Sequence, residues 1–550
     1  MSDLSDPPRA PVATLATHEV SNQPPPLVDF SAYALDGALV EAVGHTAADG
    51  NALNAFGERV GSAQTLAWSV QANRHPPEFR PFDRYGHRLD EVDFHPAYHA
   101  LMQLGLDAGI AAVAWNGTAG GHVRHAAMLY LMGHADCGVC CPFSMTHAAM
   151  PVLRLSPVLE RDWAPKVLSA QYDPRFVAAA DKRGVTIGMA MTEKQGGSDV
   201  RANTTVAKPA GADDAYTLRG HKWFCSAPMS DGFFTLAQAP GGLTCFFVPR
   251  WAPDGTRNAL QIARLKDKLG DRSNASSEIE YHDAWALRVG DEGRGVATII
   301  DMVQGTRLDC IAGSAGIMRA ALTQALWHCR HRAAFGKTLL EQPLMAQVLA
   351  DLCLEAEAAT ALTVRLADSF DRAADDAAEA AFARLATPIA KYWVCKRAPA
   401  AVYEAMECLG GAGYVEESQL PRLYRQAPLN SIWEGSGNVM VLDVLRVLGR
   451  EPDALDAFVA VVERARGALP ALDAAIDALA DAFRREPGNG RALVERAALV
   501  LQAAVLVERA APAIAEGFVR ARLDRPVPAT VGAGAAIAAA PLLFERAMPA

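Results

Sequence analysis

Two short segments combine glycine, hydroxyl and carboxyl residues at a spacing that could do chemistry. Residues 191–200 read MTEKQGGSDV, and residues 430–438 read NSIWEGSGN. Adjacent glycines let backbone N–H groups converge on an anion or an electron-rich ring, because no side chain blocks the approach. The first segment also fits an ordinary polar turn, since Gly-Gly-Ser-Asp is common turn chemistry. Taken alone, it leaves both interpretations open.

Glu434 is the only carboxyl group in the second segment. Trp433 precedes it and Gly435, Ser436 and Gly437 follow, so a tight turn could present the carboxylate to a ligand. A carboxyl group beside an aromatic ring and partly out of water has a raised proton affinity, which suits it to remove a weakly acidic C–H proton. The alternative is a helix-capping turn with a solvated glutamate.

The hydrophobic pattern predicts the elements that must position these segments. Residues 1–27 contain six prolines and predict an extended arm. Further on, Phe94, Tyr98, Leu101 and Met102 lie at helical spacing. The predicted parts are an arm at 1–27, a helical domain at 28–185, a middle β domain at 186–290, a helical bundle at 291–449 and an appended helical domain at 450–550.

Composition favours an intracellular enzyme that acts on small molecules. The formal charge of −10 argues against an overall electrostatic fit to nucleic acid or to an anionic membrane. The ten cysteines are scattered, and no segment reads as a secretion signal or a membrane span, so we expect reduced thiols in the cytoplasm. Cys137, Cys140 and Cys141 lie near His134 and His147, but no second cysteine pair completes a zinc site, so we predict no metal.

Five segments, taken together in this order, resemble the acyl-CoA dehydrogenase family of flavoenzymes. They read MTEKQGGSD, HKWFCS, RAAFGK, ECLGGAGY and NSIWEGSGN. The resemblance covers residues 18–450 and implies an α+β multidomain fold: an N-terminal helical domain, a middle β domain and a C-terminal helical bundle. The segments RLKDKLGDRSNASSEIE and LPRLYRQAPLNSIWEGSGN look most like an alkylation-response branch that carries an appended C-terminal helical domain.

The resemblance implies that the chain binds FAD. Phe224 and Ser226 take the places of the family's aromatic residue over the flavin and its hydroxyl near flavin N5. A shift of one position would put Trp223 and Cys225 there, and both registers stay open. The implied cofactor-binding residues are Met191, Thr192, Gly196, Gly197, Ser198, Phe224, Cys225, Ser226, Arg332, Phe335, Gly336, Gln342, Glu407 (commonly Gln in relatives), Gly410, Gly411, Trp433, Gly435, Ser436 and Asn438.

Glu434 aligns with the family's general base. That base removes the α-proton of an acyl-CoA thioester while the β-hydrogen leaves as hydride to flavin N5, and hydrogen bonds to the thioester carbonyl stabilise the enolate-like charge. Some relatives place the base on an earlier helix, just before an arginine. Here that pair is Thr306-Arg307, so Glu434 is the expected base. The implied substrate-binding residues are Thr192, Ser198, Ser226, Arg307 and Asn438.

The resemblance also implies partners. Arg332, Phe335 and Gly336 match a family motif that binds FAD from a neighbouring subunit, so we expect a homo-oligomer, a tetramer by resemblance. The alkylation-response branch associates its appended domain with DNA. Residues 451–550 contain eleven arginines, no lysine and thirteen acidic residues, a net charge of −2, which is not basic. Three arginines, Arg520, Arg522 and Arg525, could still form a phosphate-binding face, and a solvated helix face is the alternative.

Three functions follow from these observations. The first is an FAD-dependent acyl-CoA dehydrogenase with Glu434 as its base. The second is a flavoprotein that mainly binds and protects DNA during alkylation stress. The third is an acyl-CoA oxidase that uses oxygen.

Overall fold

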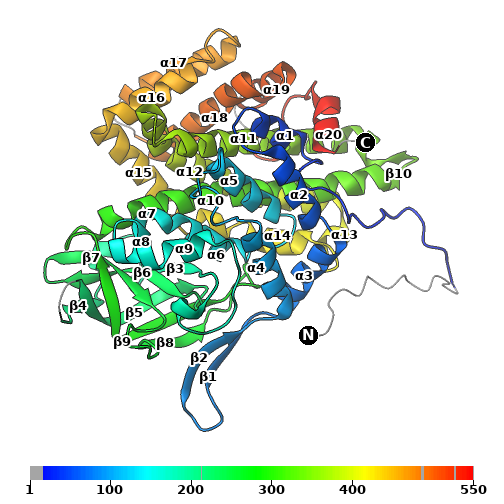
Figure 1. Ribbon diagram of the computed structural model, residues 1–550. Helices are drawn as coiled ribbons and strands as arrows, with labels where there is room; N and C mark the ends of the chain where they lie inside the picture. The colour runs from blue at the N-terminus through cyan, green and yellow to red at the C-terminus, as the bar shows by residue number, and fades with distance from the viewer. Residues whose placement is uncertain (1–16, 212–213, 485–487, 525–527, 549–550) are drawn as a thin grey trace. The chain divides into compact units, whose positions relative to one another are not determined.

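The structure is a computed structural model that describes residues 17–211, 214–484, 488–524 and 528–548. The chain divides into two compact units (Figure 1), and each is described by itself. The barrel unit comprises residues 68–121 and 136–309. The helical unit comprises the residues up to 67, residues 122–135 and the residues from 310 onward. Three helices contribute residues to both units: α3 (Ala63–Arg74), α5 (Gly121–Met132), of which only Gly121 belongs to the barrel unit, and α10 (Gly295–His331).

A closed β-barrel is the main feature of the barrel unit (Figure 1). The strands pair in the order β6-β4-β5-β9-β7, and β7 pairs again with β6, which closes the ring. Strand β3 pairs in parallel with β6, and β8 pairs antiparallel with β9. Closure leaves few unpaired edges. The strands are β3 (Ile187–Ala190), β4 (Val206–Pro209), β5 (Ala215–Ser226), β6 (Gly232–Ala239), β7 (Gly242–Pro249), β8 (Leu260–Leu265) and β9 (Ser276–Val289).

The β-prone runs of the sequence form these strands because their apolar side chains fill the barrel interior. Strand β5 alternates buried and more exposed residues along much of its length, as expected when one face meets a core. Strands β6 and β7 carry runs of six buried residues. Leu218, Phe233, Phe246 and Ile262 belong to one buried cluster. The predicted strands in the middle of the chain are therefore confirmed.

The helical pattern predicted for residues 28–185 misses one β-hairpin. Strands β1 (Glu78–Phe82) and β2 (Arg88–Asp93) pair antiparallel. Two prolines, Pro76 and Pro77, prevent α3 from continuing. Asp83 Oδ1 then accepts hydrogen bonds from two backbone N–H groups of the turn at 2.8 and 2.9 Å. The remaining helices of this unit are α4 (Pro96–Asp107), α6 (Cys140–Ala148), α7 (Met150–Leu153), α8 (Pro157–Asp162) and α9 (Ala164–Leu168).

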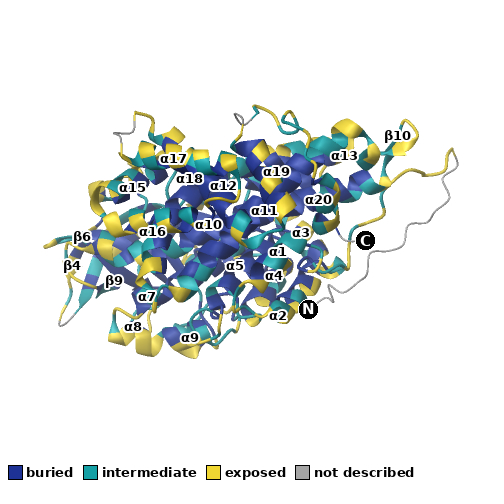
Figure 2. Ribbon diagram, turned by 90° about the horizontal axis from the view of Figure 1, so that it is seen from above, coloured by how far each residue is buried: buried dark blue, intermediate teal, exposed yellow. Residues whose placement is uncertain are grey.

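The helical unit is built around two long helices, α11 (Pro343–Arg372) and α12 (Ala377–Cys408). Most of their residues are buried (Figure 2). No helix in the described part of the chain is long and apolar enough to cross a membrane. The other helices are α1 (Gly37–Gly44), α2 (Gly50–Val60), α5 (Gly121–Met132), α13 (Gly411–Tyr414), α14 (Leu420–Gln426), α15 (Gly437–Arg450), α16 (Pro452–Glu463), α17 (Pro470–Arg484), α18 (Gly490–Arg509), α19 (Pro512–Arg522) and α20 (Ala540–Ala547).

Buried arginines join the C-terminal helices to α11. The Arg522 side chain is 3% exposed, and its guanidinium pairs with the carboxylates of Asp351 and Glu355. Arg546 pairs with Glu357 at 2.7 Å. Because a buried carboxylate that loses its partner is costly, these pairs make the last helices part of the same core.

Arginine side chains also hold the last turn of α20, here by hydrogen bonds to backbone carbonyls. Arg319 donates to the backbone carbonyl of Ala547, and Arg330 donates to that of Met548. Both arginines lie on α10. The end of the described chain is therefore fixed by hydrogen bonds to a central helix.

Candidate functional site

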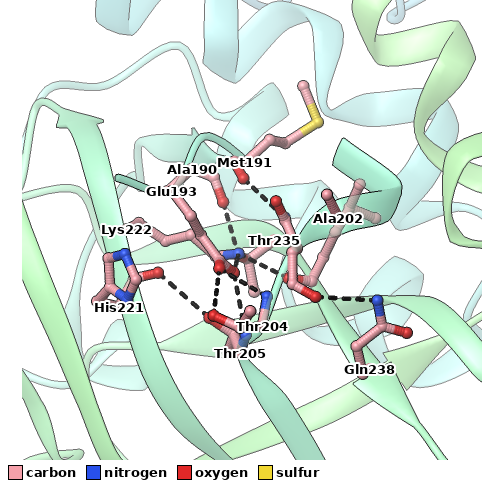
Figure 3. Close-up of polar contacts among 12 residues, drawn as sticks. Ala190, Met191, Glu193, Ala202, Thr204, Thr205, His221, Lys222, Thr235 and Gln238 are labelled. Atoms are coloured by element: carbon pink, nitrogen blue, oxygen red, sulfur yellow. Dashed lines mark hydrogen bonds and ion pairs between the residues drawn. The ribbon is translucent and has the colours of Figure 1, made fainter. Parts of the chain in front are cut away.

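The segment 191–205 follows strand β3, and a buried ion pair anchors it to a neighbouring strand (Figure 3). The side chains of Glu193 and Lys222 are both fully buried, and Lys222 Nζ lies 2.9 Å from Glu193 Oε1. The same carboxylate accepts hydrogen bonds from the backbone N–H groups of Thr204 and Thr205 at 2.7 and 3.1 Å. Lys222 also donates to the carbonyl of Leu236 at 2.7 Å. The loop is thus fixed to strands β5 and β6.

The surroundings of Glu193 keep its carboxyl group ionised, so its role is structural. Burial alone would raise the pKa of Glu193, but the Lys222 ammonium and the hydrogen bonds from Thr205 and Thr204 outweigh it and hold that pKa well below its usual range. The group therefore stays ionised and does not exchange protons near neutral pH. The sequence interpretation missed this pair, because Glu193 and Lys222 lie 29 residues apart in the chain.

The same loop carries two hydroxyl groups near its glycines. Ser198 is exposed, and Thr192 is half-buried beside Gly197. Gly196 has φ +127°, a value that favours glycine. A side chain at Gly197 would place its Cβ 2.3 Å from Thr192 Oγ1, so glycine is required there too. Asn203 Nδ2 donates to the carbonyl of Met191 at 2.9 Å, which fixes the start of the loop.

Strand β5 places the residues of the two open registers at different depths. Phe224 is 49% exposed, Trp223 is half-buried and Cys225 is fully buried. Burial raises the pKa of the Cys225 thiol to about 12, so this side chain faces the barrel core as a neutral thiol. Ser226 is half-buried, with its Oγ 3.2 Å from Ser276 Oγ. Both aromatic residues are partly accessible, so the two registers stay a prediction.

In the helical unit, Glu434 lies on a strained turn just before α15. Its φ is +56°, in the left-handed region that non-glycine residues rarely adopt, and Gly435 follows with φ +103°. Trp433 Nε1 donates to Asn430 Oδ1 at 2.9 Å. Lys391 Nζ donates to the carbonyl of Trp433 at 2.7 Å and also to that of Gly435. Strain of this kind persists where the surroundings fix the backbone, and it is frequent at active sites.

The other predicted cofactor residues of the helical unit lie on exposed connections. Phe335 is 98% exposed with φ +53°, at the tip of a two-stranded hairpin, β10 (Ala333–Ala334) and β11 (Lys337–Thr338). Gly336 completes the tip with φ +79°. Arg332 donates to the carbonyl of Asn22 at 2.7 Å, and Gln342 donates to the carbonyl of Ala334 at 2.8 Å.

A second exposed connection follows α12. Glu407, Gly410 and Gly411 are all exposed, and Gly410 has φ +59°. A Cβ added at Gly411 would meet no atom within 4 Å, so this backbone is open to a ligand. Asn438, also exposed, accepts a hydrogen bond from Arg491 of α18 at 2.9 Å. Ser436 is half-buried at the N-cap of α15 and makes no side-chain capping hydrogen bond.

Comparison with known proteins decides the family. The AidB N-terminal domain of adaptive response proteins matches residues 22–174, the acyl-CoA dehydrogenase middle domain matches 188–284 and the acyl-CoA dehydrogenase C-terminal domain matches 293–449. The putative acyl-CoA dehydrogenase AidB of Escherichia coli K12 is 46% identical over 514 residues, which covers 92% of this chain and 95% of that protein. The chain belongs to the acyl-CoA dehydrogenase family. Within it, the chain is AidB-like.

Other relatives agree with this placement in the family. Acyl-CoA dehydrogenase family member 11 of Caenorhabditis elegans is 32% identical over 431 residues, 76% of this chain and 69% of that protein. The crystal structure of C. elegans ACDH-11 in complex with C11-CoA superimposes with a TM-score of 0.83 at 27% identity and covers 94% of each chain. The predicted fold class is confirmed: a helical N-terminal domain, a β-barrel middle domain, a helical C-terminal domain and additional C-terminal helices. The predicted domain boundaries stay a prediction.

Two further predictions from the family resemblance concern arginines, and the structure bears on each of them differently. Arg307 is 6% exposed on α10, so its predicted contact with substrate stays a prediction. The predicted DNA-binding arginines do not form one face: Arg520 is exposed, but Arg522 is paired inside the core. A sequence spacing of two put these residues on different sides of α19. Arg525 lies outside the described residues.

No cysteine in the described part of the chain forms a disulfide bond. No group of three or more His, Cys, Asp or Glu residues in the described ranges could hold a metal ion. Cys137 and Cys141 are buried, and Cys140 is half-buried. These thiols contribute to packing.

Proposed function

We propose that the chain is an FAD-dependent acyl-CoA dehydrogenase that introduces an α,β double bond into an acyl-CoA thioester. The observation that carries this proposal is the turn at Glu434. A single carboxyl group is presented from a strained backbone whose carbonyls at Trp433 and Gly435 accept hydrogen bonds from Lys391, and the Trp433 side chain donates to Asn430. Such restraint is typical of a group whose position matters for chemistry. The family and its AidB-like branch support the same conclusion.

The residues present fit FAD. A flavin ring is flat and carries polar edge atoms, and the barrel unit offers an exposed ring, Phe224, with the hydroxyls of Thr192 and Ser198 on a loop of short side chains. We assign flavin contacts to this group together with Met191, Gly196, Gly197 and Ser226. When bound, FAD would supply the acceptor for the β-hydride.

The chemistry of the chain itself is proton transfer at Glu434. A carboxylate Oε atom takes the α-proton of the thioester, whose acidity increases when hydrogen bonds polarise the thioester carbonyl. Glu434 is half-buried, so it is partly withdrawn from water. The hydroxyls of Thr192, Ser198 and Ser226, with Asn438, are the polar groups we assign to substrate. The C. elegans structure with C11-CoA supports an acyl-CoA as the ligand class.

We further propose a homo-oligomer. In the described chain, Phe335 is almost fully exposed at the tip of a hairpin whose base is held by Gln342. Arg332, Phe335 and Gly336 would then contact FAD of a second copy, as the resemblance implies.

The proposal predicts a yellow protein whose colour responds to thioesters. The purified protein should retain FAD, or take it up, and show flavin absorbance. Anaerobic mixing with butyryl-, octanoyl- or palmitoyl-CoA should bleach that absorbance, because electrons pass to the flavin. A flavin-loaded protein that no acyl-CoA of the panel bleaches would contradict the proposed reaction, and release of peroxide in air would identify an oxidase instead.

A further inference from the structure

Lys391 of α12 is a buried lysine with an unusual pair of acceptors. Its side chain is 1% exposed. Its ammonium donates to the carbonyl of Trp433 at 2.7 Å and to the carbonyl of Gly435. These two residues stand directly before and after Glu434. One cation therefore holds the backbone on both sides of the proposed base.

The charge of Lys391 is not neutralised by an ordinary ion pair. In the described residues, its Nζ donates to these two backbone carbonyls rather than to a carboxylate. Burying an ammonium group without a carboxylate is costly, because the group loses its hydration. The two carbonyl oxygens offset part of that cost, because a charged donor makes stronger hydrogen bonds than a neutral one. A lysine kept at such a cost points to a role beyond packing.

The backbone of Glu434 supplies the second part of the argument. A left-handed φ of +56° is unfavourable for a glutamate, so the turn needs an external restraint to keep this shape. We propose that Lys391 is the positioning residue that keeps Glu434 in the orientation required for proton abstraction. The proposal rests on the proposed role of Glu434 as the base.

Removal of the ammonium group tests this proposal. Lys391→Met keeps most of the side-chain length and removes the donors. Arg384→Met is the matched control: Arg384 also lies on α12, and it links that helix to Asp443 and Glu451 at 3.0 and 3.2 Å. The control thus loosens the contact between α12 and the same region of the chain without touching the Glu434 turn.

Backbone hydrogen exchange gives a readout that does not depend on activity. Exchange of a peptide that contains residues 430–440 is measured in the FAD-free and the FAD-loaded full-length protein. We expect faster exchange of this peptide in Lys391→Met and unchanged exchange in Arg384→Met. Equal exchange of the peptide in wild type and Lys391→Met would overturn the proposal, even if the variant did not retain FAD.

Flavin reduction separates positioning from binding. With the acyl-CoA that reduces wild type best, we expect Lys391→Met to lower the limiting rate about 100-fold and to leave the apparent Kd of the thioester within about threefold, because a misplacement near 1 Å costs about that much in rate. An unchanged limiting rate would overturn the positioning role. If Glu434→Gln is reduced as fast as wild type, the proposed base fails, and the exchange result still reports on Lys391 separately.

Discussion

Replacement of Glu434 by glutamine is expected to lower the limiting rate of flavin reduction by acyl-CoA at least about 100-fold. General-base catalysis typically contributes 10²–10⁴-fold, and an amide cannot accept the α-proton. Glutamine keeps the size of the side chain, so flavin absorbance and the melting temperature should stay near those of wild type. Anaerobic stopped-flow measurement of flavin absorbance gives the rate.

A suitable control for this variant is Glu417→Gln. Glu417 is exposed and lies in the same helical unit, between α13 and α14. Its rate should match that of wild type. If the reduction rates of Glu434→Gln and Glu417→Gln both matched that of wild type, another group would have to remove the proton. The assignment of the base would then be wrong.

The second large effect concerns stability. Lys222→Met should destabilise the barrel unit by about 3–5 kcal/mol, because it leaves the buried carboxylate of Glu193 without its cation. The double variant Glu193→Gln with Lys222→Met should be more stable than Lys222→Met alone, since it removes the unpaired charge. Lys208→Met is the control, because Lys208 is exposed on β4. Urea unfolding followed by circular dichroism measures the differences.

The loss in Lys222→Met should depend on pH. In wild type, the folded-state pKa of Glu193 is lowered, so the stability from this group is present above its unfolded pKa, near 4.3, and is lost as the pH falls towards the folded value. Without Lys222, burial raises the pKa of Glu193 instead, and the variant loses stability as the pH rises above about 4.3. The gap between the two proteins should widen from pH 4 to pH 7. A gap independent of pH would show that lost packing, not charge, causes the effect.

Local patterns in the sequence predicted the strands of the middle domain and pointed to Glu434 as a candidate base, and the family resemblance implied the order of the domains. The residues of the Trp433–Ser436 turn are neighbours in the chain, so their small size and the single carboxylate could be read directly. The support of that turn could not, because Lys391 lies 42 residues from Trp433 in sequence. The prediction that Arg522 lies on an exposed face was wrong for the same reason, since its partner Asp351 lies 171 residues away. The β1–β2 hairpin was not predicted because its strands of five and six residues leave little periodicity to detect.

The hydrogen bonds from Arg319 and Arg330 to the last turn of α20 have a practical consequence for labelling this protein. A label or substitution at Ala547 or Met548 would disturb these hydrogen bonds. Labels intended to leave the protein intact belong on exposed side chains such as Lys208.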